Sequence, residues 1–419
     1  MAQRQVGLHD LAINGGPKVR TQPWPGRRLF GLQEKAAVDA LFDEAIATGE
    51  AFGYEGPEER AYCQEFANYM GGGFSDAVNA GTNAVYVALK ALAIEPYTEV
   101  IVSPITDPGG MMPIPLLNCI PVVADAAPGS FNVGPEQIEA MITPYTSAIV
   151  VAHIMGEPAD MPGIMAVARR HGLAVVEDCA QAHGAKLNGK YLGTFGDVAA
   201  FSTMFGKHHA TGSQGGVVYT ANEQLYTKIR QSSDRGKPYG LVGSTNVTAA
   251  LNFNLGDLGA AIGRVQLKKL PDIVNRRRQL VAQILAGITE LPSVEAPAQL
   301  QTAEPSYWFL RLKVNEKVLT CSKLEFCAAL QAEGVLLNPE YTAFPHRYEW
   351  FRKRNVFGTS ELPWSSPAYK GDAQREYLCP NASAAAVEHF LLQVRESWGA
   401  PEASDILAAL HKVTQAYLK

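Results

Sequence analysis

Between residues 76 and about 220, the sequence alternates between short, wholly apolar runs and stretches long enough to form helices. Strands that are apolar throughout are buried on both faces, and strands joined by helices run parallel to one another. The pattern therefore predicts an α/β fold in which helices cover both faces of a mostly parallel sheet. The predicted strands are 99–102, 120–124, 148–152, 174–177, 198–201 and 216–219.

The segments between these strands include three candidate helices, at residues 83–92, 135–142 and 161–171. In a sheet of this kind, ligands bind beyond the carboxyl ends of the strands. We therefore expect the functional residues to follow directly after the apolar runs.

Three regions are predicted along the chain. Residues 1–30, rich in Gly, Pro and Arg, are expected to form an N-terminal arm, and residues 31–274 a large domain. A long helical pattern covers residues 255–287, and the later sequence changes to shorter signals with aromatic loops. A smaller C-terminal α/β domain is therefore predicted over residues 275–419. Its clearest elements are a strand at 308–314 and a helix at 323–333.

The charge balance and the cysteines exclude several classes of function. The formal net charge is -5, and Lys and Arg are scattered, so nucleic-acid binding is not expected. No apolar stretch has the length of a signal peptide or a membrane span, so we expect a cytoplasmic protein without membrane contact. The six cysteines show no close CxxC pair, which argues against zinc or a disulfide framework.

The first candidate site is the turn that begins at Asn79 and leads from a short apolar run into a helix. Its Gly81-Thr82 pair could offer free backbone N–H groups and a hydroxyl to a phosphate. Gly, Thr and Asn are also ordinary helix caps, so this turn alone does not establish a phosphate site.

The second candidate is the Glu177-Asp178 pair at the end of an apolar strand. A carboxylate in this position can keep a pyridine nitrogen protonated, which makes the ring an electron sink. Asp178 is placed for that role. The alternative is that both acids cap the next helix and that His183 is an ordinary loop histidine.

The third candidate is Lys207, in a loop rich in Gly and hydroxyl residues that follows a buried strand. Partial burial lowers the pKa of a lysine amine and makes it available for covalent chemistry, although most lysines are simply surface charges. His208 and His209 come next, but no third ligand lies close enough in sequence to indicate a metal site. A phosphate turn, a strand-end acid and a lysine loop on one sheet together indicate a pyridoxal-phosphate (PLP) site.

With these motifs, the chain resembles the DegT/StrS family of sugar aminotransferases, which are fold-type-I PLP enzymes. The similarity begins at residues 11–16 (Leu-Ala-Ile-Asn-Gly-Gly), includes the Gly81-Thr82 turn, and is densest over residues 153–216. The resemblance implies a large domain with a mostly parallel seven-stranded sheet between helices, together with a smaller C-terminal α/β domain.

The resemblance also implies roles for individual residues. Lys207 would carry PLP covalently and then shuttle the substrate proton, and Asp178 would pair with the pyridine nitrogen. Gln181 would contact the ring or its hydroxyl. The implied phosphate ligands are Gly81, Thr82, Asn83, Ser202 and, reaching the neighbouring subunit of a homodimer, Asn252.

One departure from the family pattern leaves the catalytic position open. The loop holds one extra residue between Lys207 and the Gly215-Gly216 pair. Counted forward from Ser202, Lys207 occupies the catalytic position, whereas counted backward from the glycines, His208 does. The family's dehydratase branch has a histidine there, so a PLP-dependent sugar dehydratase stays an alternative.

Three further departures affect the rest of the site. Asp107 stands near the position where relatives place an aromatic residue against the ring, so no stacking residue is assigned. Asn254 replaces the arginine that relatives use for the donor carboxylate. Ser213-Gln214 replaces the usual Gly-Glu.

The function implied by the resemblance is a ping-pong transamination. L-Glutamate or L-glutamine would donate an amino group, and a keto-sugar or keto-cyclitol would accept it, in the biosynthesis of amino sugars, aminocyclitols or natural products such as antibiotics. Tyr307, Trp308, Tyr341 and Phe344 could line the acceptor pocket or belong to the core of the small domain. A non-catalytic PLP-binding protein is the remaining alternative.

Overall fold

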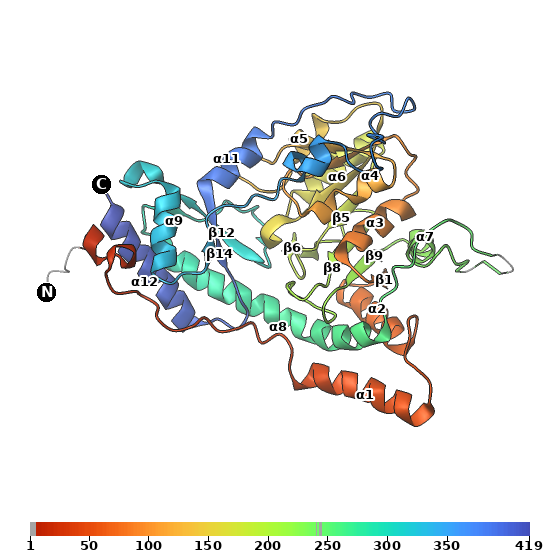
Figure 1. Ribbon diagram of the computed structural model, residues 1–419, viewed down its shortest axis with the longest axis horizontal. Helices are drawn as coiled ribbons and strands as arrows, with labels where there is room; N and C mark the ends of the chain where they lie inside the picture. The colour runs from red at the N-terminus through yellow and green to blue at the C-terminus, as the bar shows by residue number, and fades with distance from the viewer. Residues whose placement is uncertain (1–5, 240, 243–244) are drawn as a thin grey trace.

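A computed structural model describes residues 6–239, 241–242 and 245–419. Its centre is a seven-stranded sheet in the order β1-β9-β8-β5-β4-β2-β3, as predicted (Figure 1). Only β9 runs antiparallel to its neighbours in this sheet. The strands are β1 (Phe74–Val78), β2 (Glu99–Val102), β3 (Ile120–Val123), β4 (Thr146–Ala152), β5 (Ala174–Asp178), β8 (Val198–Ser202) and β9 (Gly216–Thr220).

Helices cover both faces of this sheet because each strand sends alternate apolar side chains to opposite sides. In β4, Ile149 and Val151 belong to one core, and Ala148 and Val150 to the other. The first face is covered by α2 (Pro57–Tyr69), α6 (Met161–His171) and part of α8 (Asp257–Ile288). The second is covered by α3 (Gly81–Ala91), α4 (Pro113–Leu116) and α7 (Glu223–Ser233).

A second, antiparallel sheet has the order β10-β12-β14-β13. A separate core joins it to α9, α12 and the second half of α8. Its elements are β10 (Val294–Glu295), β12 (Phe309–Val314), α9 (Lys323–Ala332), β13 (Leu337–Asn338), β14 (His389–Gln393) and α12 (Ala400–Tyr417). The remaining elements are α1 (Leu32–Thr48), α5 (Pro135–Glu139), α10 (Glu349–Arg352), α11 (Pro380–Glu388), β6 (Lys186–Leu187), β7 (Lys190–Tyr191) and β11 (Ala303–Glu304).

The predicted domain boundary near residue 275 lies inside α8, which runs unbroken beneath both sheets in Figure 1. The chain also returns to the large sheet late in the sequence, because Phe344, Trp364 and Tyr369 pack in its two cores. The division into residues 31–274 and 275–419 therefore stays a prediction.

Several observed element boundaries differ from the predicted ones by a few residues. α3 begins at Gly81 instead of residue 83, and α5 ends at Glu139 instead of residue 142. The long helix begins at Asp257, after a segment that pairs with the end of β1. β12 begins at Phe309, because the preceding Tyr307 has a left-handed backbone conformation with φ of 51°.

The predicted N-terminal arm lies along the small sheet and its helices, and residues 1–5 of it fall outside the described part of the chain. Arg20 pairs with Asp405 at 2.5 Å, and the Trp24 indole donates to the carbonyl of Gly334. Across the described ranges, no helix is both long and apolar enough to cross a membrane.

A buried ion pair joins the two sheets. The Arg311 guanidinium, on β12, lies 2.9 Å from the carboxylate of Glu157, which follows β4, and also donates to the carbonyl of Gly129. Both side chains are almost fully buried. Removal of one partner leaves the other charge without compensation in a desolvated site.

We expect Arg311→Met to lower the free energy of unfolding by about 3–5 kcal/mol, because Glu157 then stays buried and unpaired. Denaturant unfolding measures this loss. Lys313→Met is the matched control on the same strand, since Lys313 pairs with Glu388 at the surface and such pairs contribute about 0–1 kcal/mol. Equal losses in the two variants would contradict the proposed importance of the buried pair.

Candidate active site

The three predicted motifs lie at one edge of the large sheet. Strands β1, β5 and β8 run in the same direction, and their carboxyl ends lead to the Gly81 turn, Asp178 and Ser202. A Cβ atom added to Gly81 would stand 2.5 Å from the Ser202 Cβ, so these two residues are in direct contact. The sheet thus brings together residues that are far apart in the sequence.

The Gly81 turn has the properties of an anion site. Ala80, at the N-cap of α3, supplies no side-chain cap, so the first N–H groups of the helix stay available to a ligand. Thr82 is exposed on this first turn. The Asn83 amide donates one hydrogen bond to the side chain of Asn79 at 2.6 Å, and its backbone N–H stays available to a phosphate.

Asp178 lies at the end of β5 and is 7% exposed. Its Oδ1 atom accepts a hydrogen bond from the N–H of Ala180 at 3.0 Å, and its Oδ2 atom faces Gly110. A Cβ atom at residue 110 would stand only 2.8 Å from Oδ2. Burial raises the pKa of Asp178, and the Ala180 N–H and the charge of Lys207 act in the opposite direction.

Gln181 links two segments that enclose the site. Its side-chain oxygen accepts from the N–H of Met155 at 2.9 Å, and its amide donates to the Tyr341 hydroxyl at 3.2 Å. Tyr341 in turn stacks on Phe131. Burial raises the pKa of Tyr341 to about 12, so its hydroxyl stays protonated at neutral pH.

Lys207 is 8% exposed, and its Nζ atom lies 4.1 Å from the ring centre of Trp308. Its amine makes no hydrogen bond or ion pair with another described residue. Burial lowers the pKa of Lys207, while the carboxylates of Asp178 and Asp107 partly offset this effect. The amine therefore loses its proton more readily than a surface lysine does.

His208 is enclosed by protein and has no exposed surface. Its Nε2 atom donates to the carbonyl of Ser306 at 3.1 Å. Burial and the charge of Arg277 hold the pKa of His208 well below its usual range, so the ring is neutral. Of the two neighbours in this loop, Lys207 interacts electrostatically with Asp178, whereas His208 is bonded to Ser306.

Asn252 makes no described hydrogen bond with the other predicted phosphate ligands. It is exposed, and its side-chain oxygen accepts from the backbone and side chain of Asn254 at 3.1 and 2.8 Å. The segment that carries it pairs with the end of β1, next to Asn79. Among the described residues of one chain, the Asn252 side chain makes no hydrogen bond with the Gly81 turn.

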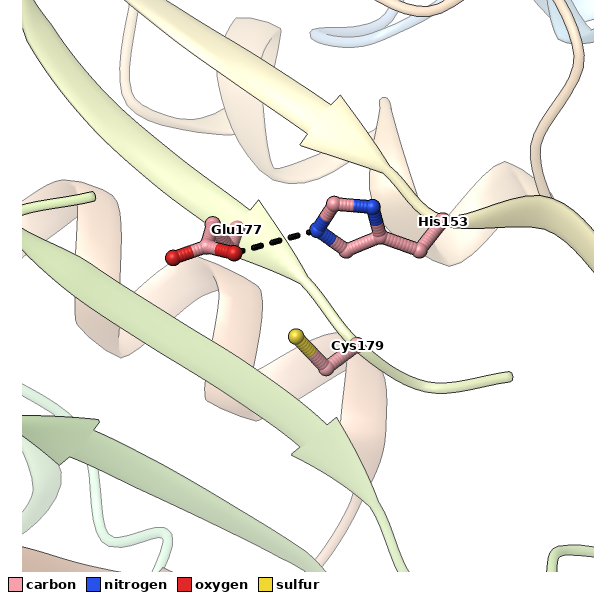
Figure 2. A group of neighbouring side chains, drawn as sticks. All are labelled: His153, Glu177 and Cys179. Atoms are coloured by element: carbon pink, nitrogen blue, oxygen red, sulfur yellow. Dashed lines mark hydrogen bonds and ion pairs between the residues drawn. The ribbon is translucent and has the colours of Figure 1, made fainter. Parts of the chain in front are cut away.

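A second cluster, His153, Glu177 and Cys179, lies at the ends of β4 and β5 (Figure 2). The His153 ring accepts from the N–H of Ala159 and pairs with Glu177 at 3.1 Å. Glu177 also accepts three backbone N–H groups from residues 193–196 at 2.7–2.8 Å. Because the ligand atoms of His153 and Glu177 are already engaged within the protein, these two residues stabilise the strand ends and the cluster gives little support for a metal site.

Trp308 and Tyr341 were predicted only as possible acceptor-pocket or core residues, and Thr106 was given no role. Trp308 comes from the small sheet and reaches Lys207, and Tyr341 reaches Gln181. Thr106 has a buried hydroxyl with no described hydrogen-bond partner, close to Gly110 and hence to Asp178. The position of Thr106 shortly after β2 could have indicated a site residue. The contacts of Trp308 with Lys207 and of Tyr341 with Gln181 depend on how distant segments fold.

The arrangement fits PLP. It offers a buried amine without a partner, a carboxylate with one oxygen free of described hydrogen bonds, and a helix N-terminus beside Ser202. The glycine at residue 110 keeps open the space in front of Asp178, which any larger side chain would narrow. These groups match the aldehyde, the ring nitrogen and the phosphate of the cofactor.

The fold and the cofactor chemistry define a PLP-dependent enzyme of fold type I. The chain belongs to the DegT/DnrJ/EryC1/StrS aminotransferase family, whose sequence profile matches residues 34–410. This finding confirms the resemblance seen in the sequence and identifies an aminotransferase family whose members act on sugars.

Three relatives illustrate the similarity. The spore coat polysaccharide biosynthesis protein SpsC of Bacillus subtilis is 32% identical over 75% of this chain and 83% of its own length. The dTDP-3-amino-3,4,6-trideoxy-alpha-D-glucose transaminase of Streptomyces venezuelae is 29% identical over 90% of this chain and 92% of its own. The X-ray structure of an aminotransferase from Psychrobacter cryohalolentis matches with a TM-score of 0.80 and 28% identity, over 94% of this chain and 98% of that chain.

Proposed function

We propose that the protein transfers an amino group from L-glutamate or L-glutamine to the ketone of a keto-sugar or keto-cyclitol. The observation that carries the proposal is the position of Lys207, buried beside Asp178 at the carboxyl edge of the sheet. A lysine of lowered pKa opposite a buried carboxylate is suited to covalent and proton-transfer chemistry.

Each part of the cofactor has a proposed ligand in this chain. Lys207 would hold PLP covalently, Asp178 would face its ring nitrogen, and Gln181 would contact the ring or its hydroxyl. When bound, PLP supplies an electron sink for the negative charge that develops at the donor's α-carbon. The phosphate ligands would be Gly81, Thr82, Asn83 and Ser202.

Lys207 would also move the proton. Its Nζ atom would take the proton from the donor's α-carbon and hold it for return to the reacting group. The Trp308 ring lies 4.1 Å from Nζ and covers the amine, whose overall burial lowers its pKa. Asp178 would keep a proton on the ring nitrogen throughout.

The acceptor is proposed from similarity. The Streptomyces relative is named for a dTDP-linked amino sugar, which supports a nucleotide-linked keto-sugar. The segments at residues 11–16 and 395–398 look more like those of members that act on cyclitols or free keto-sugars in natural-product pathways. Tyr341 is a proposed acceptor contact, because its hydroxyl reaches Gln181.

We further propose a cytoplasmic homodimer in which Asn252 reaches the phosphate of the neighbouring subunit. Asn252 is exposed, and its side chain bonds only to Asn254 among the described residues, which supports this arrangement. Helix α1 packs on α8 below the rest of the protein (Figure 1), with Glu34 bonded to Gln266 and Lys269, while Leu32 and Ile46 remain 84% and 79% exposed. Apolar side chains of this kind are suited to a subunit interface.

The dehydratase alternative depends on His208 as the catalytic group. Its ring is enclosed and donates to the carbonyl of Ser306, so that nitrogen is already engaged, which weighs against that alternative. A non-catalytic protein would not need the partly desolvated Lys207 amine.

The test is a half-reaction followed by absorption. We expect L-glutamate or L-glutamine to remove the visible band of the PLP-loaded protein and to release the corresponding keto acid, because the donor leaves its amino group on the cofactor. D-Glutamate serves as the control for a stereospecific site. If the spectrum stays unchanged with both L-donors, the transaminase assignment fails.

A further inference from the structure

A pocket of about 540 Å³ lies between residues 346–354 and 372–377, on the late segment that returns to the large sheet. In Figure 1 this segment runs, in blue, across the top of the molecule to α11. The volume is within the range of sites for small organic ligands. None of the predicted active-site residues lines this pocket.

The lining is strongly cationic, although the whole chain has a net charge of -5. Four arginines face two carboxylates, Asp372 and Glu376, so positive charge is in excess. The four arginines are Arg347, Arg352, Arg354 and Arg375.

Two of these arginines are held in place and two are free. Arg347 bonds the Ser383 hydroxyl and stacks on Phe344 at 4.1 Å, and Arg354 pairs with Glu361 at 3.3 Å. The guanidinium groups of Arg352 and Arg375 make no hydrogen bond or ion pair with any residue that the structure describes. They are therefore available to a ligand.

His346 provides a second, independent observation. It lines the same pocket and is 6% exposed, and neither of its ring nitrogens has a hydrogen-bond partner among the described residues. Buried polar atoms are rarely left unpaired, because desolvation without a hydrogen bond costs about 1–3 kcal/mol. A ligand with polar oxygens would satisfy this ring.

We propose that this pocket binds the phosphoryl or diphosphoryl group of a small molecule. Guanidinium groups suit phosphate because they present paired N–H donors and a permanent charge. The neutral His346 ring can donate one further hydrogen bond. Phe351, Trp364 and Tyr377 also line the pocket and offer flat apolar surfaces to the organic part of the ligand.

The pocket shares a wall with the proposed active site. The segment at residues 341–348 carries Tyr341 and Tyr348, whose hydroxyls lie within the electrostatic influence of Asp107. Burial and the negative charge of Asp107 raise the pKa of both hydroxyls. The same segment carries His346 and Arg347 into the pocket. A ligand bound there can therefore influence the acceptor side of the active site.

The test is calorimetric titration of the PLP-loaded protein with inorganic pyrophosphate. We expect binding that weakens tenfold or more in Arg352→Ala/Arg375→Ala, since two charge-assisted contacts are lost. Arg170→Ala/Arg276→Ala is the matched control, because it also removes two positive charges, from exposed surface pairs. It should bind pyrophosphate as the unmodified protein does.

The proposal is overturned if pyrophosphate does not bind at millimolar concentration, or if both double variants bind it equally. This binding measurement does not depend on the proposed transaminase function. Inhibition kinetics with uridine diphosphate then separate two sources of the phosphoryl group. Competition with the acceptor identifies the handle of a nucleotide-linked substrate, and a change in kcat without competition identifies a separate effector.

Discussion

The visible absorption band of the PLP-loaded protein is expected to disappear in Lys207→Ala, and transamination is expected to fall by about four orders of magnitude. Both effects have the same origin. The buried amine is the proposed covalent attachment point, and it is also the proposed group that moves the substrate proton. Absorption spectroscopy measures the first effect, and the rate of keto-acid release measures the second.

Two controls make this experiment decisive. Lys190→Ala removes an exposed lysine from β7 and should leave both the band and the rate unchanged. Added methylamine should restore part of the rate in Lys207→Ala, because a small amine can replace the missing proton carrier. A variant that retains the band and the full rate would instead favour His208 as the catalytic position.

The architecture was predictable because its signal is local. Six strands of the large sheet are short apolar runs, and each run predicts its strand within about two residues, whereas β1 contains Ser75 and Asp76 and was not among the predicted strands. The small sheet was harder to predict, since β10 and β13 are two-residue strands with no periodic pattern. The return of residues 344–386 to the large sheet depends on long-range packing, which the local pattern does not encode.

The candidate site was likewise predictable where its signal is local and not where it depends on long-range packing. Gly81, Asp178 and Lys207 lie at or within a few residues of the carboxyl ends of β1, β5 and β8, so the shared direction of these strands brings them to one edge. Trp308 and Tyr341 come from segments more than one hundred residues later, and only the fold places them against Lys207 and Gln181. The direction of the Lys207 and His208 side chains also required the structure, since neighbouring residues in an irregular loop have no fixed period.

Asp178→Asn is expected to lower kcat by about two to four orders of magnitude while the protein still binds PLP. Asparagine has the same shape and can still accept the N–H of Ala180 through its oxygen, so the fold should be kept. It carries no negative charge to keep the ring nitrogen protonated, and the electron sink is therefore weakened. Because Asp178 raises the pKa of Lys207, its loss should also extend the residual activity to lower pH, which a pH–rate profile measures.

Asp107→Asn is the matched control, because Asp107 is an exposed carboxylate that also acts on the charge of Lys207. Its side chain caps the N–H of Gly109, and asparagine can make the same bond. Its loss of charge is screened by water, so kcat should fall by less than about tenfold. If the two variants lose activity equally, Asp178 acts only as a nearby charge, and its proposed pairing with the ring nitrogen is wrong.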